Sequence, residues 1–74
     1  MRIGIPREIK TLEGRVALVP GACAELVAHG HEVWIESGAG LASGYPDADY
    51  EARGVRLAAD AAEVWQRAEL LVKD

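Results

Sequence analysis

Residues 20–36, "PGACAELVAHGHEVWIE", contain the pattern that decides the fold, because a helix signal is followed at once by a strand signal. Pro20 suits the first position of a helix, where its missing N–H has no helical partner to lose. An apolar stripe at helical spacing follows, and Gly30 supplies the stop. Residues 32–36 carry the β-branched and aromatic side chains typical of a strand. The stretch therefore predicts a helix that leads into a strand.

The same alternation extends along the chain in both directions. Residues 2–5 predict a short strand that ends at Pro6, which cannot donate to a sheet ladder. Beyond residue 36 the pattern predicts a helix at 47–53, a strand at 55–58, a helix at 60–68 and a strand at 70–73. The order β-α-β-α-β-α-β favours a doubly wound α/β fold with a parallel sheet. In the common strand order 3-2-1-4, the first and fourth strands flank the switch point where ligands bind.

Size and composition limit the classes of function. The chain has 74 residues, and a domain of this size buries only about 60% of its unfolded surface. Because it also stops at the apolar run "ELLVKD", we expect residues 1–74 to be part of a larger domain. The net charge of −4 argues against nucleic acid as a partner. No apolar run approaches the ~20 residues that span a membrane, and no signal peptide is recognisable.

Cysteine usage bears on compartment and metal binding. Cys23 is the only cysteine, so it cannot form an internal disulfide. With no export signal, a cytoplasmic location is expected. No cluster of cysteine and histidine with metal-ligand spacing is present in the sequence, so we expect no metal site.

The loop between the first strand and the first helix contains the strongest candidate for ligand binding. Arg15 is followed by the apolar residues "VALVP", which would anchor a loop that holds one guanidinium in place. Five fixed N–H donors suit Arg15 to a bidentate grip on a small carboxylate. The alternative is a surface arginine paired with Glu13 or Glu8, which would contribute less than about 1 kcal/mol.

A glycine-rich stretch follows the second strand and superficially resembles a dinucleotide-binding fingerprint. Gly38, Gly40 and Gly44 place the third glycine one residue late, and Pro46 delays the helix further. The fingerprint also belongs after the first strand and needs an acidic residue about 20 positions on, where this chain has Ala58. A rim loop or a turn is therefore favoured over a nucleotide site.

The other notable side chains have structural interpretations. They are His29, His31, Cys23, Trp34, Trp65, Asp47, Asp49 and Glu51. The histidines flank a helix end, where a cation suits the dipole. The cysteine lies on the apolar stripe, and the tryptophans are expected in a core or an interface. The three acids predict a solvated helix face. The residues by themselves indicate no complete catalytic set.

A set of short patterns along the whole chain resembles a known family. In order they are "RIGIP-E-K", "E-RVAL-P", "L---GHEV-IE-GAG", "D-DY---G" and "--VW--A-L--K". They are similar to the N-terminal segment shared by alanine dehydrogenase and the alpha subunit of the proton-translocating nicotinamide nucleotide transhydrogenase. The stretch "EIKTLE-RVAL" resembles the dehydrogenase branch more closely than the transhydrogenase branch.

The resemblance implies a function for a longer protein. Members of the dehydrogenase branch have two Rossmann-like domains, and this segment would begin the substrate (catalytic) domain. A central domain, absent here, would bind NAD. The reaction would convert L-alanine, NAD and water to pyruvate, ammonia and NADH. Arg15 matches the family's substrate-carboxylate arginine. The full-length protein would be a cytoplasmic homo-oligomer, and the 74-residue piece alone would be inactive.

The resemblance also marks what is missing and what differs. Lys73 matches the first lysine of a "K-K-EP"-like sequence, but the substrate lysine would follow Asp74, so no catalytic or cofactor-binding residue is assigned here. Pro46 replaces a Ser-like helix cap, Cys23 a small aliphatic residue and Asp74 an apolar one. Two alternatives stay open. One is a transhydrogenase alpha subunit, and the other is a standalone module that binds 2-oxo acids without catalysis.

Overall fold

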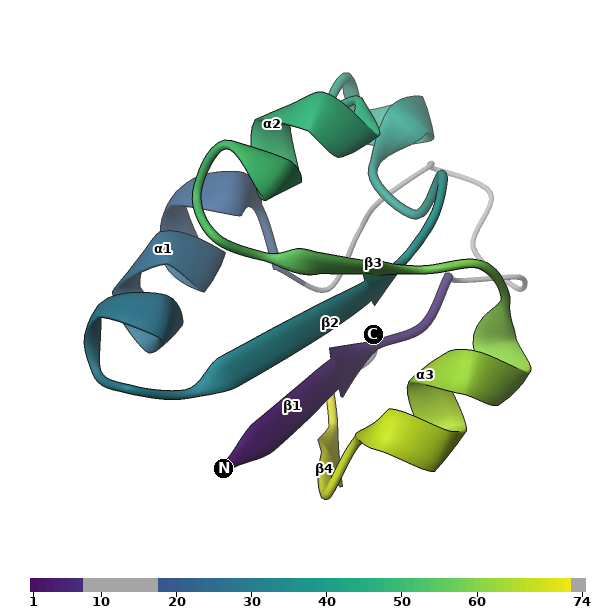
Figure 1. Cartoon of the computed structure of the whole chain (residues 1–74). Helices are drawn as coiled ribbons and strands as arrows, with labels where there is room; N and C mark the ends of the chain where they lie inside the picture. The colour runs from purple at the N-terminus through teal and green to yellow at the C-terminus, as the bar shows by residue number, and fades with distance from the viewer. Residues whose placement is uncertain (8–17, 73–74) are drawn as a thin grey trace.

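The computed structural model describes residues 1–7 and 18–72 as four strands and intervening helices (Figure 1). In chain order they are β1 (Arg2–Ile5), α1 (Pro20–Ala28), β2 (Glu32–Glu36), the 3₁₀ helix η1 (Leu41–Ser43), α2 (Asp47–Glu51), β3 (Arg56–Ala58), α3 (Ala61–Arg67) and β4 (Leu70–Leu71). The strands form one parallel sheet in the order β3-β2-β1-β4. The predicted α/β class and strand order are confirmed.

The apolar core lies on the side of the sheet that α1 and α2 cover (Figure 1). Val33 and Ile35 of β2 point to this side, since alternate residues of a strand face alternate sides. The buried members of this core are Ile5, Cys23, Val33, Ile35, Ala39, Tyr50 and Val55. Cys23, fully buried, has the core position predicted from its place on the apolar stripe.

The opposite side of the sheet is covered by α3 (Figure 1). This helix can approach β1 closely because Gly4 has no side chain. A Cβ on Gly4 would lie 2.6 Å from Ala68 Cβ and 2.8 Å from Val64 Cγ1. Val64 is fully buried in this contact. A glycine in the first strand is therefore a packing requirement of the third helix.

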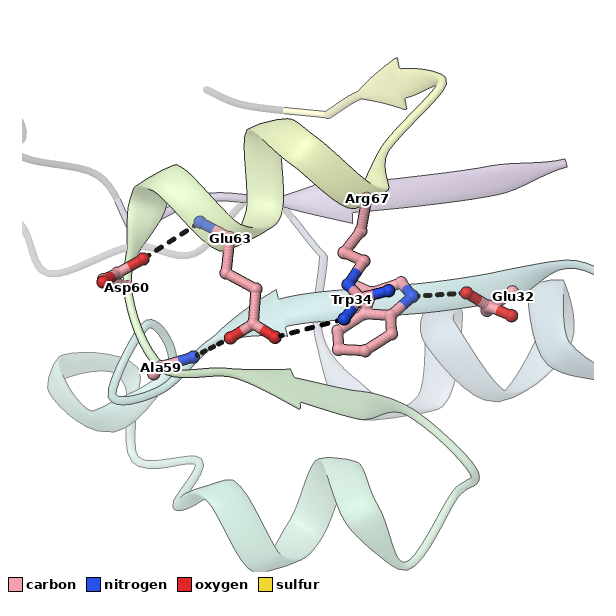
Figure 2. Close-up of polar contacts among 6 residues, drawn as sticks. All are labelled: Glu32, Trp34, Ala59, Asp60, Glu63 and Arg67. Atoms are coloured by element: carbon pink, nitrogen blue, oxygen red, sulfur yellow. Dashed lines mark hydrogen bonds and ion pairs between the residues drawn. The ribbon is translucent and has the colours of Figure 1, made fainter.

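The start of α3 is capped by Asp60, whose spacing to Glu63 is that of a capping box. Asp60 Oδ1 accepts a hydrogen bond of 2.9 Å from the Glu63 N–H (Figure 2). The return contact differs by one residue, because Glu63 Oε1 accepts from the Ala59 N–H at 2.8 Å. Two N–H groups before and within the first turn are satisfied in this way.

The two tryptophans differ in burial. Trp34 of β2 is half-buried against α3, whereas Trp65 on the outer side of α3 is 56% exposed. A core position is therefore wrong for Trp65. The reason is helical geometry: Val64, its neighbour, points to the sheet, so Trp65 points away from it.

Candidate functional site

The switch point of the sheet lies between β1 and β4, where the strand order reverses. The chain leaves β1 through Pro6 and Arg7 and leaves β4 at Val72. The Val72 N–H donates to the Gly4 carbonyl oxygen at 2.9 Å, so the ends of β1 and β4 lie side by side. The edge predicted to hold a ligand is thus formed by these two exits.

Arg15, the predicted substrate-binding residue, lies outside the described residues, as does Lys73. The segment 8–17 that contains Arg15 begins after Arg7 and ends before Leu18, and both flanks are described. Each flank is held by a side chain from elsewhere in the fold.

The first flank is held by Glu36, the last residue of β2. Its Oε1 accepts a hydrogen bond of 2.8 Å from the backbone N–H of Arg7. Glu36 therefore ties the exit of β1 to the end of the neighbouring strand.

The second flank is held by Tyr50 of α2. The Tyr50 hydroxyl donates to the carbonyl oxygen of Leu18 at 2.9 Å, and the tyrosine is fully buried. Burial raises the pKa of this hydroxyl to about 12, so it remains a donor at neutral pH. Leu18 itself packs against the apolar core.

The glycine-rich loop between β2 and α2 is bonded within the protein. Asp47 accepts a hydrogen bond from the Gly38 N–H at 2.9 Å and another from the Ser37 hydroxyl at 2.6 Å. The N–H groups of Ser37, Ala39, Leu41, Ser43, Gly44 and Tyr45 donate to backbone carbonyls. A phosphate cradle needs such groups turned toward the ligand, so these residues do not fit a dinucleotide.

Two further candidates have structural positions. Asp47 is half-buried and binds the loop, so a purely solvated role for this acid is wrong. Burial raises the pKa of the Cys23 thiol to about 11, which leaves it protonated and unsuited to nucleophilic attack at neutral pH.

The histidines lie at opposite ends of one turn. His29 Nδ1 is 2.8 Å from the Glu25 carbonyl oxygen. His31 Nδ1 is buried and has no hydrogen-bond partner in the part of the chain that the structure describes. Within residues 1–7 and 18–72, no group of three or more potential metal ligands gathers, and no helix has the length and apolar character to cross a membrane.

Comparison with known proteins decides the family. Residues 4–73 match the family described as "Alanine dehydrogenase/PNT, N-terminal domain". The chain belongs to this family. The resemblance predicted from the short sequence patterns is therefore confirmed, across nearly the whole chain.

Relatives in this alanine dehydrogenase/PNT family match the chain from end to end. It is 51% identical over 73 residues to an alanine dehydrogenase from Halomonas elongata and 48% identical over 73 residues to one from Bacillus subtilis. A solved L-alanine dehydrogenase superposes with a TM-score of 0.93 at 44% identity, covering 99% of this chain. The transhydrogenase from Sinorhizobium meliloti gives 0.89 at 36% identity, again over 99% of this chain. The chain spans about a fifth of the length of these proteins.

Proposed function

We propose that this chain is the N-terminal segment of an NAD-dependent L-alanine dehydrogenase and supplies the arginine that binds the substrate carboxylate. The observation that carries the proposal is the 51% identity to an alanine dehydrogenase over 73 residues. The fold supports it, because the chain leaves β1 beside the β1–β4 switch point, and Arg15 follows ten residues after the end of β1 in the sequence. The substrate would be L-alanine in one direction and pyruvate in the other.

The role proposed for Arg15 follows from the chemistry of the guanidinium. A planar fork of donors fixes a carboxylate by two parallel hydrogen bonds, and so fixes the direction of the α-carbon. Orienting the reacting carbon toward a hydride acceptor can contribute several kcal/mol to lowering the barrier. Arg15 would therefore bind and orient the substrate rather than take part in proton transfer.

The described residues do not fit the NAD that this reaction requires, because the glycine-loop amides are used inside the protein. We place NAD in a central domain outside these 74 residues, and expect no hydride transfer from the 74-residue chain alone. In the same proposal the complete enzyme is a cytoplasmic homo-oligomer. It acts on a small molecule, without a nucleic acid or membrane partner.

The first test is the intact mass of the native gene product, followed by an assay for NADH formation from L-alanine and NAD. A mass several times that of this chain together with alanine turnover would support the dehydrogenase. A mass equal to 7.9 kDa would contradict it. The protein would then be a module that binds 2-oxo acids without catalysis.

The second test is Arg15→Ala with Arg15→Lys for comparison, measured in the native gene product. Removing a charge-assisted contact of about 1.5–3 kcal/mol should raise the KM for L-alanine and pyruvate about 10- to 100-fold. The lysine variant keeps the charge and loses the fork, so its KM should be intermediate. The KM for NAD should stay unchanged. An unchanged KM for alanine in Arg15→Ala would show that Arg15 does not bind the substrate carboxylate.

The similarity to the Sinorhizobium meliloti transhydrogenase supports a second candidate, the alpha subunit of a proton-translocating transhydrogenase. The lower identity, 36% against 44% for the solved L-alanine dehydrogenase, places it second. Hydride exchange between nicotinamide nucleotides without alanine turnover would reverse this order.

A further inference from the structure

Strand β4 lies at one edge of the sheet, although its side chains are those of an interior strand. It pairs with β1, and the stretch "LLV" at residues 70–72 is apolar at each position. Parallel strands with continuous apolar runs are normally buried on both faces, because helices cover each side of the sheet. Leu70 is nevertheless 48% exposed, whereas Ile3, its partner in β1, is buried. The sheet therefore presents uncovered apolar surface at β4.

The exposed side of β4 belongs to the face that α1 and α2 cover elsewhere. Leu70 is in register with Ile3, and Ile3 with Val33, so the three side chains point to the same face. On this face α1 packs on β2 and α2 packs on β3 (Figure 1). Leu71 points to the other face, since its Cδ2 would lie 3.2 Å from a Cβ built on Gly4. The two faces of β4 therefore have different neighbours.

The handedness of the connections decides which element can cover Leu70. The chain moves from β1 to β2 to β3 through α1 and α2 on one face, then reverses and reaches β4 through α3 on the opposite face (Figure 1). Right-handed crossovers require this arrangement, because reversing the direction along the sheet reverses the face of the helix. A further strand on the outer edge of β4 would continue in the reversed direction. Its connecting helix would lie on the α3 face and would leave Leu70 uncovered.

We propose that the Leu70 face of β4 is a docking surface for an apolar segment of the same chain that lies beyond the next crossover in the complete protein. This inference rests on the proposed function, in which residues 1–74 are one segment of a longer enzyme. The relatives are about five times as long as this chain, so a protein of their length contains sequence for such a segment.

Continuity with the core favours the same chain over a second copy. Ile3 is buried between Leu70 and Val33, and Val33 belongs to the apolar core under α1 and α2. An element placed on Leu70 would therefore extend this core by one strand. A tethered segment also reaches its docking site at a high effective concentration, about millimolar for short flexible linkers.

The first test is thiol labelling of the native gene product with a maleimide. Leu70→Cys places a thiol on the proposed surface, and Glu25→Cys places one on an exposed position of α1 as the control. The buried Cys23 is common to both variants, and peptide mapping separates the new thiol from every other. Labelling of Leu70→Cys should be at least about tenfold slower, because it requires local opening. Equal rates would overturn the proposal.

The second test identifies the occupant. The native gene product is grown with photo-leucine, a leucine analogue that crosslinks on irradiation, and Leu70→Met is the matched variant that loses the analogue at this position. A crosslinked peptide absent from Leu70→Met should join position 70 to the same chain, more than about 30 residues beyond position 74, since a βαβ unit takes about that length. A nearer crosslink, a product with the mass of two chains, or no crosslink that depends on Leu70 would each overturn the proposal.

The outcomes separate this inference from the proposed function. Alanine turnover together with equal labelling rates would leave the dehydrogenase standing and show that the docking surface is wrong. A Leu70-dependent crosslink to a distant segment, in a protein that does not turn over alanine, would support the docking surface and contradict the proposed function.

Discussion

The two faces of the sheet are built from the same strands but are stabilised differently. On the face covered by α1 and α2, Val33 and Ile35 of β2 are enclosed by apolar side chains and are at most 1% exposed. On the face covered by α3, the alternate residues of the same strand are Glu32, Trp34 and Glu36. The first face is stabilised mainly by burial, whereas the second adds polar and aromatic contacts to the burial of Val64 and Ala58.

The polar face is organised around one ring. The Arg67 and Arg56 guanidinium carbons lie 5.1 Å and 5.8 Å from the centroid of the Trp34 ring. Figure 2 shows Arg67 beside this ring. The Glu63 carboxylate pairs with Arg67 and also accepts from the Ala59 N–H. Glu32 accepts from the Trp34 indole N–H. Such contacts contribute about 0.5–1 kcal/mol each when exposed. The comparison indicates that the apolar face supplies most of the stability, and four changes test it.

The largest expected effect is on the apolar face. Ile35→Ala should lower the free energy of unfolding by about 2–5 kcal/mol, because it leaves a cavity in an enclosed core. Trp34→Ala removes a larger side chain, but Trp34 is only half-buried on the opposite face, so the free energy of unfolding should fall by less than in Ile35→Ala. Urea unfolding of both variants measures the difference. An equal or greater loss from Trp34→Ala would contradict the comparison.

The next effect concerns the contact between α3 and β1. Gly4→Ala should destabilise the fold by about 1–3 kcal/mol, since its Cβ would overlap Ala68 and Val64. Gly21→Ala is the matched control, because no atom lies within 4 Å of a Cβ built there. Gly21 lies in α1, so this change should be neutral or stabilising by up to about 1 kcal/mol. Similar melting temperatures for the two variants would show that α3 can shift without loss.

High pH should weaken the apolar face selectively. The pKa of Cys23 is raised from 9.0 to about 11 and that of Tyr50 from 10.0 to about 12, both chiefly by burial. From pH 9 for Cys23 and from pH 10 for Tyr50, the unfolded chain loses a proton that the folded chain keeps, so stability falls by up to about 1.4 kcal/mol per pH unit for each group until its folded pKa is reached. Cys23→Ala should move the onset of this fall to about pH 10. If the pH at which stability begins to fall is the same in Cys23→Ala, Cys23 is not the group that titrates first.

The smallest effect is expected on the polar face. Arg67→Gln should cost about 0.5–1 kcal/mol, because it removes a cation from the Trp34 ring and from Glu63. Arg53→Gln makes the same change of charge at an exposed site on the other side and should cost less. The tryptophan fluorescence should shift in the first variant alone. A loss above about 2 kcal/mol in Arg67→Gln would mean that the two faces contribute comparably.

Contacts in the candidate site could not be predicted from the local sequence pattern alone. Asp47 and Asp49 share a first helical turn, and their sequence predicts a solvated face for both. The structure gives Asp47 two hydrogen bonds to the preceding loop, which no helical periodicity indicates. The sequence pattern likewise did not single out Tyr50, whose hydroxyl donates to the Leu18 carbonyl oxygen.

The sequence by itself determined the alternation of strands and helices, the parallel order of the sheet, the cap at Asp60 and the family. These depend on periodicity, on residues within a few positions of one another and on whole-chain similarity. Only the tertiary structure decided why Gly4 and Gly40 must be small, that Trp65 faces outward and that Tyr50 holds Leu18. Each involves surfaces brought together by folding, and the space between packed elements is not encoded in any one of them.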